Sequence, residues 1–282
     1  MKFEKFKFLK EKYGQVASWA IWSRQGNNPP MFNMGDLTIL DPQQNPDVLS
    51  ELKPDIVFVG LNVSRNIGDL EPFSNFHPNY HNAQDYKLRN ALYHTELWGG
   101  YITDIIKDYP ELHGQNVMSF LNDNPDVERK NIETFREELK DLGTENPTII
   151  ALGNDAYKIL TRNLEDTFTI VKVTHYSAYI NPQKYREEFE SIPHLVNLIN
   201  YIKKKNIVCP MPMYWDDLYM DIKNNIPSEI DLPMPLILAV WHEASHEQKK
   251  ESFIEQILIA HKYGLIQRVS YFIMQLKDDE LF

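Results

Sequence analysis

The sequence predicts an α/β fold, namely a three-layer α/β/α domain around a central, mostly parallel, four-stranded sheet, plus a small C-terminal helical hairpin. Four short apolar segments have the composition of buried strands. Amphipathic segments with helical spacing lie between them, and strands that alternate with helices form parallel sheets through right-handed crossovers. The predicted strands are 55–61 (DIVFVGL), 100–102, 148–152 (TIIAL) and 168–173 (FTIVKV).

Polar residues suited to chemistry follow three of these strands. Asn62 follows the first, Thr103 and Asp104 follow the second, and the fourth leads into Thr174 and His175. The carboxyl ends of the strands in an open parallel sheet line the ligand crevice. These residues, distant along the chain, are therefore predicted to meet in one pocket.

The elements around the first strand differ in regularity. Residues 5–24 carry apolar side chains at helical spacing, which predicts an amphipathic opening helix. The Asn-, Pro- and Gly-rich segment 25–46 predicts a long loop with a short strand at 37–40. Residues 64–80 lack periodicity, and long irregular loops in compact domains are often functional. A helix is predicted at 83–97.

Three further helices are predicted around the last two strands. Gly143 is expected to cap the first of them at its C-terminus, and Asn154 to cap the second at its N-terminus. Pro193 predicts a break or kink in the third segment, which forms one or two helices. The predicted ranges are 129–142, 155–164 and 182–205.

The composition changes near residue 207, which predicts a main domain at 1–206 and an extension at 207–282. Five prolines fall between positions 210 and 235, as expected of an irregular crossing segment. Segments 253–261 and 265–276 have apolar periodicity and predict the helical hairpin. Two such helices are too small for a core of their own, so they are expected to pack on the main domain or on a partner.

The overall composition is that of an ordinary folded protein, with 43% hydrophobic and 24% charged residues among 282. Cys209 is the only cysteine, which excludes an intramolecular disulfide and a thiolate metal cluster. No apolar run approaches the ~20 residues of a membrane span, and the first residues lack the apolar region of a signal peptide. A cytoplasmic protein without a membrane partner is expected. The net charge of −11 argues against sequence-blind nucleic-acid binding, although lysines cluster at 2–12.

Two strand ends resemble the motifs of the uracil-DNA glycosylase superfamily. Gly60-Leu61-Asn62 is similar to its first motif, a Gly-x-Asp or Gly-x-Asn turn that holds the attacking water. Thr174-His175-Tyr176-Ser177 is similar to its second motif, His-Pro-Ser. Phe76 and Asp104 stand where the family has a base-stacking aromatic residue and a residue, usually Asn, that contacts the base edge. The resemblance covers about residues 50–205.

The resemblance implies DNA base excision, a step of DNA repair, at a site that needs no metal and no cofactor. Asn62 would orient water through its carbonyl oxygen, and a neutral His175 would donate a hydrogen bond to the leaving base. The base would be flipped out of the DNA and held in a pocket. The implied base-binding residues are Gly60, Leu61, Phe76 and Asp104, and the implied DNA-binding residues are Ser177, Tyr176 and Tyr179.

Departures from the family pattern bear on the substrate. Val63 and Tyr176 occupy the positions of the two motif prolines. An ionised Asp104 only accepts hydrogen bonds, so it would repel the O4 atom of uracil and favour an exocyclic amine such as N4 of cytosine. The expected substrate is therefore an amine-bearing or modified base rather than uracil.

Each of the four key residues also has a purely structural interpretation. Asn62 would then tie a turn, His175 would be a satisfied strand-end histidine, Phe76 would belong to the core, and Asp104 would cap a helix. The corresponding protein is a weak or inactive relative that binds a nucleotide or a protein partner through the same pocket. The acidic charge and the missing prolines favour this alternative. The strandedness of the DNA and the oligomeric state stay open.

A third alternative is a zinc-dependent hydrolase. His242-Glu243-x-x-His246 matches the H-E-x-x-H pattern, in which two histidines on one helix face bind zinc. However, Ser245 and Gln248 resemble a capping box, which would start the helix inside the motif and separate the histidines. This alternative is therefore the weakest of the three.

Overall fold

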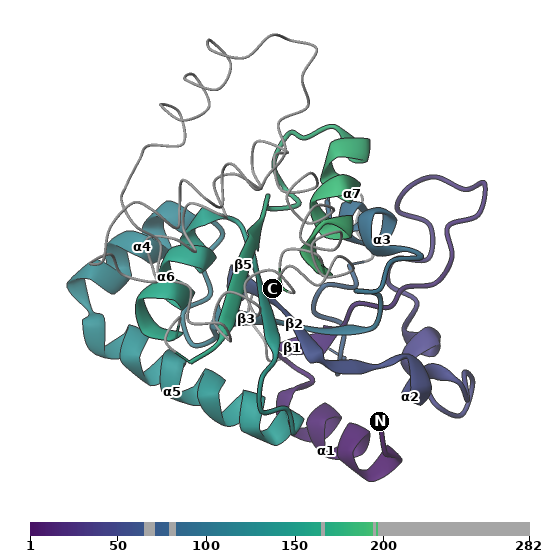
Figure 1. Cartoon of the computed structure of the whole chain (residues 1–282), viewed down its shortest axis with the longest axis horizontal. Helices are drawn as coiled ribbons and strands as arrows, with labels where there is room; N and C mark the ends of the chain where they lie inside the picture. Colours follow the sequence, from purple (N-terminus) through teal and green to yellow (C-terminus); the bar gives the residue numbers. More distant parts are fainter. Residues whose placement is uncertain (65–70, 79–82, 165–166, 194–195, 197–282) are drawn as a thin grey trace, which may run out of the picture. The chain divides into compact units, whose positions relative to one another are not determined.

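The computed structural model shows a mixed α/β fold (Figure 1). The chain divides into two compact units, Met1–Glu190 and Ser191–Phe282, and nearly all described residues belong to the first. The structure describes residues 1–64, 71–78, 83–164, 167–193 and 196.

Several predictions concern residues outside those ranges. They are the helical hairpin at 253–261 and 265–276, the Pro-rich segment, and the His242–His246 motif. The predicted helical segment beyond Pro193 lies there as well. The domain boundary at 206/207 therefore stays a prediction.

The sheet has five described strands in the order β1-β3-β2-β4-β5. Strands β3, β2, β4 and β5 run parallel to one another, and β1 runs antiparallel to β3 at the edge. The four predicted strands are all present, and β1 is the additional one. The bounds are Ala17–Trp19 (β1), Lys53–Asn62 (β2), Gly100–Ile106 (β3), Thr148–Leu152 (β4) and Thr169–Val173 (β5).

The prediction of one helix over residues 5–24 was wrong. Helix α1 ends at Tyr13, and residues 17–19 form β1 instead. All three residues of β1 are buried, so the segment has no polar face to expose as an amphipathic helix does. The Trp19 ring packs edge-on against Tyr101 of β3, with ring centroids 5.1 Å apart.

The helices agree with the sequence pattern in part. Gly143 adopts a left-handed conformation (φ 82°) and caps α5, which confirms the predicted helix end. Residues 37–40 form a 3₁₀ helix and not a strand, because the Asp36 side chain accepts a hydrogen bond from the Thr38 N–H and starts a turn. Helix α4 was not predicted. The helices are α1 (Phe3–Tyr13), η1 (Leu37–Leu40), α2 (Val48–Glu51), α3 (Tyr86–Leu92), α4 (Gly114–Asp123), α5 (Pro125–Leu142), α6 (Asn154–Leu164) and α7 (Pro182–Glu190).

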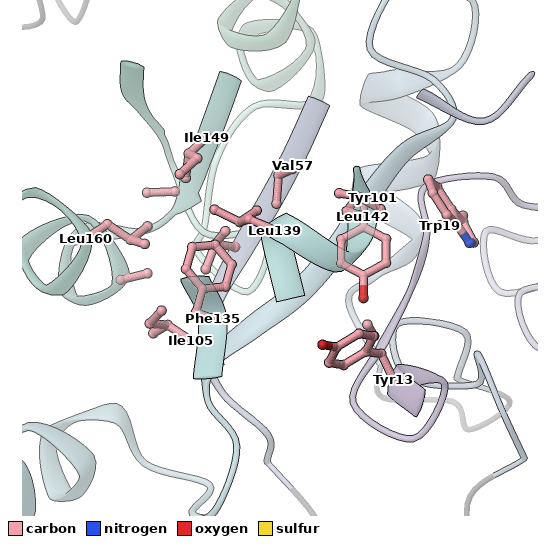
Figure 2. Packing of buried hydrophobic residues seen from close by; sticks show 14 of the residues in the cluster. Tyr13, Trp19, Val57, Tyr101, Ile105, Phe135, Leu139, Leu142, Ile149 and Leu160 are labelled. Atoms are coloured by element: carbon pink, nitrogen blue, oxygen red, sulfur yellow. The ribbon is translucent and has the colours of Figure 1, made fainter. Parts of the chain in front are cut away.

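Helices pack against side chains that alternate along the strands. Figure 2 shows Phe135 and Leu139 of α5 packed in one cluster with Val57 of β2. The next residue along β2, Phe58, points to the other side and contacts Phe189 of α7, with ring centroids 6.1 Å apart. The central strands are thus buried, which explains their near-continuous apolar sequences. Among the described helices, none is both long enough and apolar enough to cross a membrane.

Candidate functional site

The carboxyl ends of four parallel strands meet at one edge of the sheet, which we call the carboxyl edge. Val59 of β2 is paired with Ala151 of β4, and Ala151 with Lys172 of β5. Asn62 and His175 each lie three residues beyond the paired positions 59 and 172. Strand β4 lies between β2 and β5, so these two strands are ~10 Å apart, and both residues lie at this end of the sheet.

Asn62 anchors the chain segment that follows β3. Its amide nitrogen donates to the backbone oxygens of Val63 (3.1 Å), Tyr109 (3.3 Å) and Glu111 (2.7 Å). Since carbonyls only accept hydrogen bonds, the NH₂ group must face them and the carbonyl oxygen Oδ1 must point elsewhere. The side chain thus ties the loop through its nitrogen, and Oδ1 takes no part in these three contacts, so tying the loop does not conflict with an acceptor role for Oδ1.

Asp104 does not end its strand, contrary to the prediction, because β3 continues to Ile106. It pairs with Gly60, two residues short of the end of β2. Its side chain is buried, with 6% of the residue exposed, and accepts a hydrogen bond from Asn75 Nδ2 at 3.2 Å. A Cβ atom on Gly60 would overlap Oδ1 of Asp104, so the carboxyl group packs directly over that glycine.

The protonation of Asp104 differs from that of a surface carboxyl. Burial raises the pKa of Asp104 to about 7, although the hydrogen bond from Asn75 acts in the opposite direction. Near neutral pH both the neutral and the ionised forms are populated. Asp104 can therefore donate a hydrogen bond in its neutral form, whereas the expectation from the sequence concerned only the ionised form, which accepts.

His175 follows β5 and is held in a compact turn. Its Nδ1 atom accepts the backbone N–H of Ser177 at 3.1 Å and lies 2.8 Å from the Ser177 hydroxyl. Because a backbone N–H can only donate, the neutral ring carries its proton on Nε2. Burial lowers the pKa of His175 to about 4, so the ring is neutral at physiological pH. Tyr176 stacks on it, with ring centroids 4.2 Å apart.

The loop that begins at Thr174 is fixed at several points. Thr174 donates from its backbone N–H and its hydroxyl to Glu188 of α7, at 2.7 and 2.8 Å. Lys87 of α3 donates to the backbone oxygen of Ala178 at 3.0 Å. Tyr179, the next residue, is fully exposed. A well-anchored loop therefore presents the Tyr179 side chain to solvent, four residues after His175.

Phe76 lies in the irregular segment 71–78, which packs against β1. The residue is 4% exposed, and its backbone oxygen accepts a hydrogen bond from Trp22 Nε1 at 3.0 Å. Both Phe76 (φ 67°) and Phe73 (φ 72°) adopt the left-handed backbone conformation, which is costly for bulky residues. Such strain persists only where surrounding contacts impose it, and it is common at functional loops.

Sequence reasoning missed Asn75, which lies beside Phe76 and joins this segment to Asp104. Its side chain donates to the backbone oxygen of Val16 at 3.1 Å as well as to Asp104. In the sequence, the only sign of this role is that Asn75 is an amide residue between Phe73 and Phe76. Gly153 completes the edge: it has φ 96°, and a Cβ atom there would lie 3.1 Å from Cβ of His175.

The structure thus brings Asn62, His175 and Asp104 to one region of the sheet, with Asp104 deeper than the other two. Within the described ranges, no group of three or more His, Cys, Asp or Glu side chains is arranged to hold a metal ion. No protein-family model, no curated protein and no solved structure matches this chain.

Proposed function

We propose that this protein is a DNA glycosylase-like hydrolase, which flips a base out of DNA and cleaves its N-glycosidic bond. The observation that supports this most is the presence of two chemically complementary groups at the carboxyl edge. Asn62 presents a hydrogen-bond acceptor, and the neutral His175 ring carries its proton on Nε2. Helices packed on alternate side chains of β2 also support a three-layer α/β/α domain as part of the proposal.

The reaction needs both groups. When the C1′–N bond breaks, its electron pair leaves with the base and positive charge develops on the sugar. A water oxygen then bonds to C1′ and releases a proton to solvent. Asn62 Oδ1 would orient this water by accepting one of its hydrogens. His175 Nε2–H would donate to the base as negative charge develops there.

Asp104 would determine which base is accepted. In its ionised form the carboxylate favours an exocyclic amine such as N4 of cytosine, whereas the neutral form can donate to a carbonyl such as O4 of uracil. The carboxyl group is buried, and so is Phe76, the residue after its hydrogen-bond partner Asn75. The proposal therefore requires segment 71–78 to move when a base enters, after which Phe76 would stack on the base.

The loop after β5 would contact DNA. Tyr179 is the exposed aromatic side chain that could fill the gap left by the flipped base. Tyr176 stacks on His175, so its role would be to support that ring. The Ser177 hydroxyl lies against His175 Nδ1 and its phosphate contact would depend on rotation of that hydroxyl.

A base-excision assay tests the proposal. Oligonucleotides that carry uracil, cytosine or modified cytosines are incubated with the protein, and abasic sites are revealed by alkaline strand cleavage. Excision of at least one base should be lost in Asn62→Ala and His175→Ala. The exposed residues Asn146 and His113 provide matched controls, because Asn146→Ala and His113→Ala should keep activity. Equal cleavage by all four variants would disprove the assigned roles.

A non-catalytic binding protein is the second candidate. The burial of Phe76 and Asp104 favours it, because a working base pocket has to be open to its substrate. Such a protein would bind a nucleotide or protein partner at the carboxyl edge and produce no abasic site from any oligonucleotide. The zinc hydrolase through His242, Glu243 and His246 stays a minor candidate, which a measurement of bound zinc in the purified full chain would test.

A further inference from the structure

A concave site lies at the end of the sheet opposite the carboxyl edge, where β2 begins. It is a cavity of about 350 Å³, which we call the amino-edge cavity. Strand β2 is 10 residues long, so its two ends are ~30 Å apart, although Trp22 of this cavity is hydrogen-bonded to the backbone of Phe76 in segment 71–78. Its lining includes three aromatic residues, Trp22, Tyr93 and Trp98, and three charged ones, Arg24, Glu51 and Lys53.

Gly99 brings the chain segments of this cavity together. Its N–H donates to the backbone oxygen of Ala20 at 3.0 Å, and its own oxygen accepts the Lys53 N–H at 2.8 Å. Its φ is 90°, and a Cβ atom there would overlap the backbone oxygen of Glu51. Only glycine permits this approach, and through it Lys53 and Trp98, the residue before Gly99, both line the cavity.

One wall of the cavity is an aromatic cluster of fixed orientation. The Trp98 ring lies between Trp22 and Tyr93, with centroid distances of 5.8 and 5.5 Å and interplanar angles of 60° and 76°. Trp22 is additionally held by the hydrogen bond from its Nε1 to Phe76. A rigid aromatic surface binds another flat ring at low entropic cost, as the aromatic side chains that stack on bases in nucleic-acid complexes do.

The charged side chains of the cavity favour an anion. The lining contains two cationic residues, Arg24 and Lys53, and one carboxylate, Glu51. None of the three forms an ion pair with another described residue. Lys53 Nζ donates to the backbone oxygen of Glu96 at 2.6 Å, which positions the ammonium group and leaves it two further N–H donors. A local excess of positive charge in a chain of net charge −11 is a specific feature of this site.

We propose that the amino-edge cavity binds a mononucleotide, with the base stacked on Trp98 and the phosphate held by Lys53 and Arg24. The cavity volume falls within the range of small-molecule sites. The ligand is either a free nucleoside monophosphate or the 5′-phosphorylated end of a nucleic acid, since both carry the same ring and phosphate. The inference goes beyond the proposed function and uses no residue of the carboxyl edge.

Titration calorimetry of the full chain with AMP, GMP, CMP and UMP tests this inference. Saturable binding of at least one of them in the micromolar to low-millimolar range is expected. The matching nucleoside and ribose 5-phosphate should each bind at least ~10-fold more weakly, because each lacks one of the two recognised parts. A 5′-phosphorylated oligonucleotide that binds more tightly than the monophosphate would identify a nucleic-acid end as the ligand.

Variants locate the site. Arg24→Gln with Lys53→Gln should weaken binding at least ~10-fold, whereas the exposed pair Arg129→Gln with Lys158→Gln should leave it unchanged. Trp98→Phe should bind more tightly than Trp98→Leu. His175→Ala should bind like the wild type. The inference is overturned if neither the monophosphates nor the phosphorylated oligonucleotide binds, if the Arg24 and Lys53 changes have no effect, or if His175→Ala abolishes binding.

Discussion

Replacing Asn62 with Asp tests whether the carboxyl edge is built for an amide. The uracil-DNA glycosylase motif that Gly60-Leu61-Asn62 resembles has either Asp or Asn at the third position, and Asp is the stronger base. Here the amide nitrogen faces three backbone oxygens at 2.7, 3.1 and 3.3 Å. A carboxylate in the same place would turn an oxygen toward them. We therefore expect Asn62→Asp to destabilise the protein and not to increase excision.

The size of this effect follows from the contacts. An NH₂ group has two hydrogens, so at most two of the three contacts are full hydrogen bonds, each worth ~1 kcal/mol. Their loss and the repulsion between oxygens together give ~2–3 kcal/mol of lost stability, moderated by water because Asn62 is only partly buried. Urea unfolding at neutral pH measures this, with Asn62→Ala as the matched variant that loses the same bonds without adding charge.

The pH dependence separates lost bonds from repulsion. A carboxyl group that faces carbonyl oxygens has a folded-state pKa above its unfolded value, so the native state binds more protons in that range. The gap in unfolding free energy between Asn62→Asp and Asn62→Ala should therefore narrow as the pH falls. If Asn62→Asp is as stable as the wild type at neutral pH, or excises a base faster, the assigned amide orientation is wrong.

Three other changes test the geometry around this edge. Gly60→Ala should lower the urea midpoint and abolish excision, because its Cβ atom would overlap the Asp104 carboxyl. Asp104→Asn should gain stability relative to the wild type as the pH rises from about 4 to about 7. The reason is that the native Asp104 carboxyl, with a pKa of about 7, retains a proton that the unfolded chain releases. Urea titrations of both proteins at several pH values measure the difference, and equal pH dependence would contradict it. The same change should remove a pH-dependent shift of wild-type base preference, measured as the ratio of uracil to cytosine excision on either side of pH 7. Tyr179→Ala should leave the urea midpoint unchanged, because the side chain is fully exposed, yet weaken binding of a DNA duplex with an abasic site; unchanged affinity in a fluorescence titration would exclude a role in filling the gap.

The parts of the fold predicted from sequence are those with local signals. The strand at 148–152 agrees with the structure at both ends, because Pro147 and Gly153 flank a short apolar run. Gly143 similarly marks the end of α5. In contrast, β1 has only three residues, and its pairing with β3 joins positions more than 80 residues apart. Such pairing depends on tertiary contacts that no local pattern records.

The strands that carry the candidate residues were predicted, but the contacts of these residues were not. A polar residue was taken to end the second strand, whereas Asp104 lies inside it and is satisfied by Asn75 from a distant loop. The bonds from Asn62 reach residues 47 and 49 positions away. The amino-edge cavity was not predicted, because its side chains come from several separate segments that Gly99 joins.

The two proposed sites share one physical connection. Trp22 in the amino-edge cavity donates to the backbone oxygen of Phe76, and the adjacent Asn75 donates to Asp104 near the carboxyl edge. In the proposed mechanism, base entry at the carboxyl edge would require the segment with Asn75 and Phe76 to move, which would strain or break the bond to Trp22. A mononucleotide that binds more tightly while the Trp22–Phe76 bond is intact would therefore favour the arrangement of segment 71–78 seen here. By linkage, an entering base would weaken mononucleotide binding by the same factor. A ligand with equal affinity for both arrangements would produce no coupling, however continuous the contacts.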